Sequence, residues 1–224
     1  MLGLDLDGCV ADFVGSMRKI YAEWSGKPKE RLDQNPIYGF PEWGLIEGEY
    51  EKLHRFAITQ KDLFLNVLPI DGAAQSLRRL STEGIWIRVA THRIFIPNFH
   101  AQAANQTIKW LEKYDIRYWD LCLIQDKAAV FANLFVEDSP VNIKRLEKKG
   151  IETICFTNSI NKNDTEIAQR AANWEEAEEL IRQKYYVWRE KQGLSKITNP
   201  GTAPDEESGN LSHDGYTDLI PYIL

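Results

Sequence analysis

The first dozen residues constrain the fold more than any other part of the sequence. Leucines alternate over residues 2–6 and predict a short buried strand, which runs directly into the carboxylates of Asp5 and Asp7. Burying an unpaired charge is costly, so the two acids are expected at the carboxyl end of the strand and not in its interior. An open α/β sheet forms its ligand crevice at that end, and Gly8 permits the sharp turn that follows.

Two carboxylates at the end of a strand suggest phosphoryl chemistry, although other interpretations stay open. They suit a hard cation such as Mg²⁺, which takes oxygen ligands and keeps waters that a phosphate can replace. Asp5 could attack phosphorus as a nucleophile, and Asp7 could protonate the leaving oxygen and later deprotonate water. The same residues also suit a plain turn, whereas a helix–loop–helix calcium site would need further ligands and a closing Glu that the sequence lacks.

From residue 71 onward, apolar strands alternate with amphipathic helices. Strands are predicted over residues 85–90, 121–124, 134–136 and 151–156, and helices over about 73–84, 99–114, 140–150 and 173–188. This alternation predicts an α/β, Rossmann-like fold with a parallel sheet, helices on both faces and right-handed crossovers. We expect the core domain to comprise residues 1–12 and 71–192.

Residues 13–70 are typical of a small helical insertion between the first strand and the rest of the core. Two helical patterns flank an aromatic loop over residues 35–44. Phe40 and Trp43 of this loop would suit a nucleobase or a sugar if they face a crevice. Packing within the insertion is the equal alternative for both side chains.

Residues 193–224 differ in composition from the rest of the chain. They begin as a linker-like stretch rich in Pro, Gly, Ser and acidic residues, which predicts a flexible tail. The last residues, 216–224, are apolar again. They are expected to dock either on the domain or on a neighbouring subunit, which leaves a homodimer as one open alternative.

Charge and hydropathy exclude several classes of partner. Asp and Glu outnumber Lys and Arg by 33 to 27, for a net charge of −6, which argues against non-specific nucleic-acid binding. No apolar run approaches the ~18 residues of a membrane span, so no membrane partner is expected. The N-terminus leaves no room for a signal peptide, and the three scattered cysteines are expected to be reduced core thiols of a cytoplasmic protein.

Candidate partners for the two carboxylates follow the later strands. They are Thr91, His92 and Arg93 after the second strand, Lys127 after the third, and Glu137 and Asp138 after the fourth. A hydroxyl and backbone N–H groups can hold phosphate oxygens, and a lysine can neutralise a phosphate beside a carboxylate. One acid of the last pair would complete a metal site and the other would orient a ligand or a water. Because the carboxyl ends of parallel strands share one edge, we expect these groups to meet.

This set resembles the motifs of the haloacid dehalogenase-like phosphohydrolases. The matching residues are Asp5-Leu6-Asp7-Gly8, Thr91, Lys127 and Glu137-Asp138. The resemblance implies that Asp5 is the nucleophile, that Asp7 is the general acid and base, and that Thr91 and Lys127 bind the phosphoryl group. It also implies that Asp5, the backbone carbonyl of Asp7 and Asp138 hold Mg²⁺, and that the insertion is a helical cap.

A narrower resemblance, over residues 1–185, is to the 5′(3′)-deoxyribonucleotidases. The similar stretches are residues 5–13, Gly39-Phe40, residues 61–64, Leu68-Pro69 and residues 125–140. This resemblance implies a nucleoside monophosphate substrate. By the same analogy Phe13, Phe40 and Trp43 line the pocket for the base.

We therefore expect a Mg²⁺-dependent phosphomonoesterase that hydrolyses nucleoside monophosphates through an aspartyl-phosphate. The sequence departs from the narrower family at Glu137, where a second aspartate is usual, at Ser139 and Gln125, where arginines are expected, and at Ile58 in place of a tryptophan. These departures leave open an alternative substrate, a sugar phosphate or another small phosphoester. A catalytically silent binding module with the same fold is the third alternative.

Overall fold

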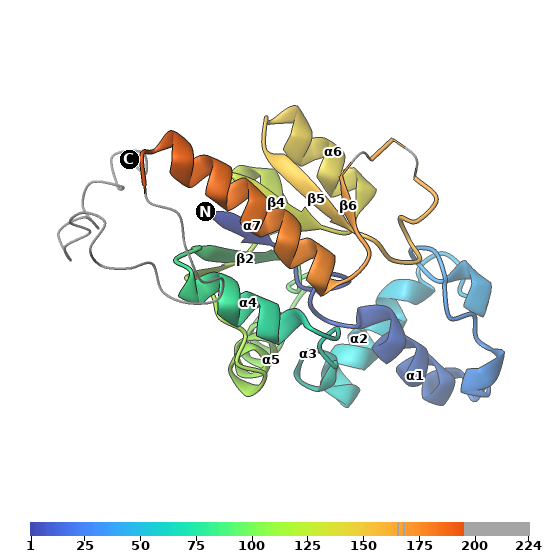
Figure 1. Ribbon diagram of the computed structural model, residues 1–224. Coiled ribbons are helices and arrows are strands. Elements are labelled where there is room, and N and C mark those ends of the chain that lie inside the picture. Colours follow the sequence, from blue (N-terminus) through green and yellow to red (C-terminus); the bar gives the residue numbers. More distant parts are fainter. Residues whose placement is uncertain (165, 168, 195–224) are drawn as a thin grey trace.

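The computed structural model describes residues 1–164, 166–167 and 169–194, in which six parallel strands form one sheet (Figure 1). The strands are β1 (Leu2–Leu4), β2 (Ile87–Thr91), β3 (Asp120–Leu123), β4 (Leu134–Glu137), β5 (Glu152–Phe156) and β6 (Arg170–Ala171). Their order across the sheet is β3-β2-β1-β4-β5-β6, and every neighbouring pair is parallel. The predicted parallel α/β sheet is confirmed, and β1 lies at its centre.

Helices cover both faces of the sheet, as the alternation predicts. One face packs against α4 (Ala73–Thr82), α5 (His100–Lys113) and α7 (Trp174–Lys191), and the other against α6 (Pro140–Lys148) and the short 3₁₀ turn η3 (Lys127–Ala129). In Figure 1, α4 and α7 lie on one side of the strands and α6 on the other. The central strand is fully enclosed, with Leu2 and Leu4 at most 2 % exposed.

The helix ends follow local capping chemistry. Asn173 caps α7 by accepting a hydrogen bond from the Glu176 amide at 2.9 Å, as its sequence predicts. Pro140 occupies the first turn of α6, also as predicted. The prediction of Asn98 as the cap of α5 is wrong, because Asn98 has a φ of 68° and Phe99 occupies the cap position.

The helical insertion is residues 13–70, between β1 and α4. It contains α1 (Phe13–Ser25), α2 (Glu49–Lys61), α3 (Leu63–Asn66) and the 3₁₀ turns η1 (Lys29–Arg31) and η2 (Pro41–Trp43). Its two ends hydrogen-bond to each other, because the Asp12 amide donates to the Leu68 carbonyl at 2.8 Å and the Ile70 amide donates to the Val10 carbonyl at 2.7 Å. The insertion therefore leaves and re-enters the core through two adjacent, hydrogen-bonded segments.

Helix α5 fixes the insertion to the core. The side-chain amide of Gln106 donates to the Ile58 carbonyl at 3.0 Å and to the Asp62 carboxylate at 2.8 Å. The indole N–H of Trp110 donates to the Val67 carbonyl at 2.7 Å. The bonds to the Ile58 and Val67 carbonyls are buried and tie the backbone of the insertion to a core helix, so the position of the insertion relative to the core is specified by polar contacts as well as by packing.

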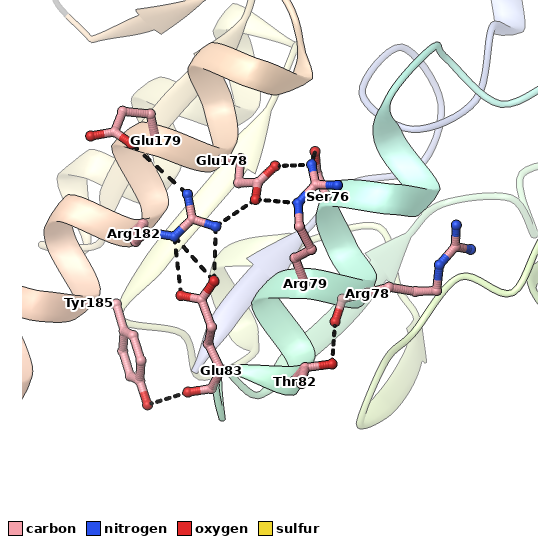
Figure 2. Close-up of polar contacts among 9 residues, drawn as sticks. All are labelled: Ser76, Arg78, Arg79, Thr82, Glu83, Glu178, Glu179, Arg182 and Tyr185. Atoms are coloured by element: carbon pink, nitrogen blue, oxygen red, sulfur yellow. Dashed lines mark hydrogen bonds and ion pairs between the residues drawn. The ribbon is translucent and has the colours of Figure 1, made fainter. Parts of the chain in front are cut away.

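An ion-pair network joins α4 to the C-terminal helix α7 (Figure 2). Arg182 bridges Glu83, at 2.9 Å, and Glu178, at 2.5 Å. Arg79 pairs with Glu178 from the other side, with Nε–Oε1 at 2.8 Å. Burial alone would raise the pKa of Glu178, but hydrogen bonds from Arg79, Ser76 and Arg182 outweigh it and lower this pKa to about 2.

Two further predictions concern the cysteines and the C-terminal tail. Cys9, Cys122 and Cys155 form no disulfide, as predicted. The predicted flexible tail lies almost entirely outside the described residues, which end at Leu194. Within those residues, none of the helices combines the length and the apolar character needed to cross a membrane.

We predict that Glu178→Gln destabilises the protein at neutral pH by about 2 kcal/mol. Breaking a buried pair costs more than this, but Arg79 is half exposed, so solvent screens part of the interaction. Because the folded pKa of Glu178 is depressed, its stabilisation is complete above its unfolded value and is lost as the pH falls toward about 2. Urea unfolding at pH 7 and at pH 3 should therefore show a larger difference between variant and wild type at pH 7.

Glu179→Gln is the matched control, since the neighbouring Glu179 is 61 % exposed and lies 3.9 Å from Arg182. It should change the free energy of unfolding by less than ~0.5 kcal/mol at either pH. A Glu178→Gln protein as stable as this control at pH 7 would contradict the role given to the network.

Candidate active site

The carboxyl ends of β1, β2 and β4 place the predicted site residues at one edge of the sheet. In the sheet register, Leu4 pairs with Val89 on one side and with Val136 on the other. Asp5 follows Leu4 directly, and its amide donates to the Val136 carbonyl at 3.0 Å. Thr91 ends β2, and Glu137 and Asp138 follow Val136, so all three leave the sheet beside Asp5.

Lys127 lies at the centre of this group. Its ammonium is 2.7 Å from Asp5 Oδ1 and 2.7 Å from Glu137 Oε2, and all three side chains are at most 8 % exposed. Glu137 Oε1 in turn accepts the backbone N–H groups of Asp138, at 3.2 Å, and Ser139, at 3.0 Å. Glu137 therefore orients Lys127 toward Asp5 and shares its charge, and the expected role of orienting a ligand or a water stays a prediction.

Asp138, the other acid of the pair, lies beside Asp5. Carboxylate oxygens of these two residues lie within 4.8 Å of each other and of the Cys9 thiol, and all three side chains are buried. Burial and the nearby carboxylates of Asp138 and Asp5 raise the pKa of the Cys9 thiol well above its usual value. The thiol therefore stays protonated, and the donors available to an ion are oxygens, which fits Mg²⁺ better than a thiophilic metal.

The buried carboxylates of Asp5 and Asp138 are electrostatically unfavourable beside each other. Burial raises the pKa of Asp5 to about 7, against the opposing effect of Lys127. Burial, followed by the charges of Glu137 and Asp5, also raises the pKa of Asp138. One ammonium is insufficient to hold three buried carboxylates in their ionised forms. A divalent cation between Asp5 and Asp138 would supply the missing positive charge.

Gly8 allows Asp138 to approach the loop after β1. Its φ is 89°, and a Cβ atom at this position would lie 2.1 Å from Asp138 Oδ2. The backbone of the first motif and the side chain of the last one are thus in direct contact. Any larger residue would displace the carboxylate from Asp5, which explains the glycine by close approach as well as by backbone conformation.

Two asparagines that the sequence analysis missed hold Asp138 in place. Asn158 Nδ2 donates to Asp138 Oδ2 at 2.7 Å, and Asn161 Nδ2 donates to the Asp138 carbonyl at 2.8 Å. Both residues follow β5, the next strand in the sheet. Both could have been predicted, because polar residues just past a fifth parallel strand reach the same edge of the sheet.

Asp7 and the residues after β2 form the second half of the site. Arg93 pairs with Asp7, with Nη2–Oδ1 at 2.7 Å, so its guanidinium contacts a carboxylate. Burial and then the charge of Lys127 lower the pKa of His92. Thr91 is 1 % exposed at the end of β2. Phosphate binding by Thr91, His92, Arg93 and Lys127 stays a prediction.

The aromatic residues predicted to bind substrate pack mainly within the insertion. Phe40 and Trp43 are 2 % and 1 % exposed, and their rings stack at 4.2 Å. The Trp43 indole N–H donates to the Asp33 carbonyl at 2.9 Å, and this satisfied burial agrees with the packing alternative. Phe13 is half-buried and lies edge-on to His54 at 5.7 Å. Base binding by these aromatics stays a prediction.

Comparisons with known proteins agree with this geometry. Residues 1–186 match the family described as "5' nucleotidase, deoxy (Pyrimidine), cytosolic type C protein". The chain belongs to this family. It is also 45 % identical over 183 residues to a protein of Chlorobaculum tepidum named "Putative 5'(3')-deoxyribonucleotidase", a match that covers 81 % of this chain and 90 % of the relative.

The fold is shared with a wider group of hydrolases. A solved haloacid dehalogenase-like family hydrolase of Streptococcus pneumoniae superposes with a TM-score of 0.55 at 11 % identity, over 80 % of this chain and 97 % of that chain. Family and relative together make this nucleotidase a phosphoric monoester hydrolase, and it shares the fold of the haloacid dehalogenase-like hydrolases. The resemblance expected from Asp5-Leu6-Asp7-Gly8 and its partner motifs is thereby confirmed.

We predict that Asn158→Ala weakens metal binding by this nucleotidase. Loss of a residue that orients a metal ligand typically lowers affinity ~10–100-fold, and the hydrogen bond from Asn158 would give it this role if Asp138 holds the ion. The rise in thermal unfolding temperature with added Mg²⁺ should therefore need ~10–100-fold more Mg²⁺ in the variant. Asn163→Ala, at an exposed asparagine of the same loop, should behave as wild type. Equal Mg²⁺ dependence in all three proteins would remove Asn158 from the site.

Proposed function

We propose that this enzyme hydrolyses nucleoside monophosphates with Mg²⁺ as cofactor and Asp5 as nucleophile. The observation that carries the proposal is the buried Asp5 carboxylate, held by Lys127 at 2.7 Å and within 4.8 Å of Asp138. The similarity to a protein named as a deoxyribonucleotidase supports a small nucleotide as substrate. The family's description as cytosolic supports a cytoplasmic location.

The proposed chemistry has two steps, with Asp5 as nucleophile and Asp7 as general acid and base. A carboxylate oxygen of Asp5 attacks phosphorus in line, and the bond to the departing sugar oxygen breaks as Asp7 protonates that oxygen. Water then attacks the phosphorus of the aspartyl-phosphate and gives its proton to Asp7. The bond between Asp5 and phosphorus breaks in this step, so phosphate is released and the Asp5 carboxylate is restored. Lys127, oriented by Glu137, stabilises the negative charge that gathers on the phosphoryl oxygens.

Asp5, Asp138 and the backbone carbonyl of Asp7 would hold the metal ion. When bound, Mg²⁺ supplies the positive charge that draws the phosphate dianion toward a carboxylate nucleophile. The backbone and hydroxyl of Thr91, with the neighbouring His92, would receive phosphoryl oxygens at the end of β2. The site needs both the Lys127 ammonium and the metal ion, because the carboxylates of Asp5 and Asp138 and a phosphate dianion repel one another strongly at this spacing.

The helical insertion would act as a cap over the phosphate end of the site. It contributes Phe13, Phe40 and Trp43 as candidates for the base pocket. Since Phe40 and Trp43 are almost fully buried, stacking on a base would require the insertion to shift or the base to reach their edges. This burial keeps a sugar phosphate or another small phosphoester as the second candidate substrate.

A panel of phosphomonoesters at fixed Mg²⁺ tests the proposal. We expect kcat/KM to fall by ~10–100-fold when the base is removed from a nucleoside monophosphate, because binding energy remote from phosphorus assists the chemical step. The panel should contain ribo- and deoxyribonucleotides, the corresponding sugar phosphates and p-nitrophenyl phosphate. Equal efficiency on the sugar phosphates would favour the second candidate, and no turnover on any ester would identify a silent binding module.

Asp5→Asn is the control within the same panel. It should abolish turnover on every ester, since an amide is a poor nucleophile, while circular dichroism shows an intact fold. Substantial activity in this variant would refute the assignment of Asp5.

A further inference from the structure

Arg93 is a fully enclosed charge just beyond the end of β2. Its side chain is 0 % exposed, whereas the Asp7 carboxylate that it pairs with is 23 % exposed. Its Nε and Nη2 both contact Asp7, and Nη1 has no hydrogen-bond partner among the described residues. A guanidinium closed off from solvent is poorly placed to receive a phosphate that arrives through the crevice.

Two aromatic rings hold the guanidinium in place. Its central carbon lies 4.6 Å from the centre of the Phe64 ring and 5.1 Å from that of Trp110, distances typical of cation–π contacts. Phe64 belongs to the insertion and Trp110 to the core helix α5. Trp110 is itself fixed by its hydrogen bond to Val67. Arg93 is thus a rigid group held between the insertion and the core.

The Arg93 guanidinium makes different hydrogen bonds to the two carboxylate oxygens of Asp7. Oδ1 accepts from Nη2 at 2.7 Å and from Nε at 3.2 Å, whereas Oδ2 accepts only the shared Nε at 3.0 Å. Oδ2 therefore keeps lone pairs for another partner, on a carboxylate side chain that is partly exposed to solvent. An acid that gives a proton to a leaving oxygen and takes one from water needs one such oxygen in a fixed direction.

We propose that Arg93 is the positioning residue for Asp7, fixing its carboxylate so that Oδ2 faces the departing sugar oxygen. The inference rests on the proposed function, in which Asp7 is the acid and base. Oδ2 gives its proton to the sugar oxygen as the P–O bond to the sugar breaks and the Asp5–phosphorus bond forms. It takes a proton back from the attacking water. Arg93 itself exchanges no proton and contacts neither phosphorus nor the sugar.

Substrates with different leaving groups test this role. A sugar alkoxide needs protonation to depart, whereas p-nitrophenolate is stable as an anion, and both esters share the same phosphoryl group. We expect Arg93→Met to lower kcat/KM by ~100-fold for a nucleoside monophosphate and by less than ~5-fold for p-nitrophenyl phosphate. Arg93→Lys keeps the charge but loses the forked contact, so it should show the same selective loss and serves if the Met variant folds poorly.

Two further variants complete the experiment. In an Asp7→Asn background, Arg93→Met should leave the residual rate on the nucleoside monophosphate within ~2-fold, instead of lowering it ~100-fold, because the two residues act as a unit. Arg88→Met is the matched control. Arg88 lies on β2 and, like Arg93, makes a forked pair with a carboxylate, here Asp120 at the start of the outer strand β3, so its loss should leave the ratio between the two substrates unchanged.

An equal loss on both esters would overturn the inference and indicate that Arg93 binds the phosphoryl group they share. An additive loss in the Asp7→Asn background would overturn it as well. Failure of the proposed function is a separate result, because it would appear as undiminished nucleotide turnover in the Asp5→Asn protein whatever the Arg93 variants do.

Discussion

The contact of the Lys127 ammonium with Asp5 and Glu137 is the interaction on which the site depends. Three carboxylates are buried at one edge of the sheet, and an uncompensated charge there would be costly. Lys127 is 5 % exposed, and although burial opposes it, Asp5 and Glu137 raise the pKa of its ammonium. The lysine is therefore a fixed positive charge that lets the Asp5 carboxylate, the proposed nucleophile, remain buried.

The rest of the architecture holds the groups around this contact. Parallel pairing of β1 with β2 and β4 brings their carboxyl ends to one line. Gly8 permits contact with Asp138, and Asn158 holds the opposite side of that carboxylate. Trp110 of α5 anchors the insertion through its hydrogen bond to Val67, and its ring also packs against the Arg93 guanidinium. The position of the insertion and the orientation of Asp7 are consequently linked through the same aromatic pair.

The parts of this account that depend on local pattern could be predicted from the sequence. Alternating apolar runs predicted the strands and helices, and the rule that parallel strands end at one edge predicted that Asp5, Lys127 and Asp138 meet. The Asn173 cap and the first-turn Pro140 were predictable for the same reason, since each acts within a few residues. The two-residue strand β6 was too short to produce a periodic signal.

The contacts that depend on tertiary approach could not be predicted. Arg93 and Asp7 are 86 residues apart, and nothing local distinguishes a clamp on a carboxylate from a phosphate ligand. The pairing of Arg79 with Glu178 spans 99 residues, and its helices show only ordinary charged faces. Whether Phe40 and Trp43 face a crevice or the interior of the insertion depended on how its loop folds, which an aromatic composition alone does not specify.

Trapping the covalent intermediate tests the central claim most directly. Wild-type enzyme is mixed with a nucleoside monophosphate and Mg²⁺, quenched in acid during turnover, and treated with borohydride, which reduces an acyl phosphate to the alcohol. The account predicts homoserine in place of aspartate at position 5, and no conversion when substrate is omitted. Product formation with Asp5 recovered unchanged, or with another carboxylate reduced in its place, would contradict it.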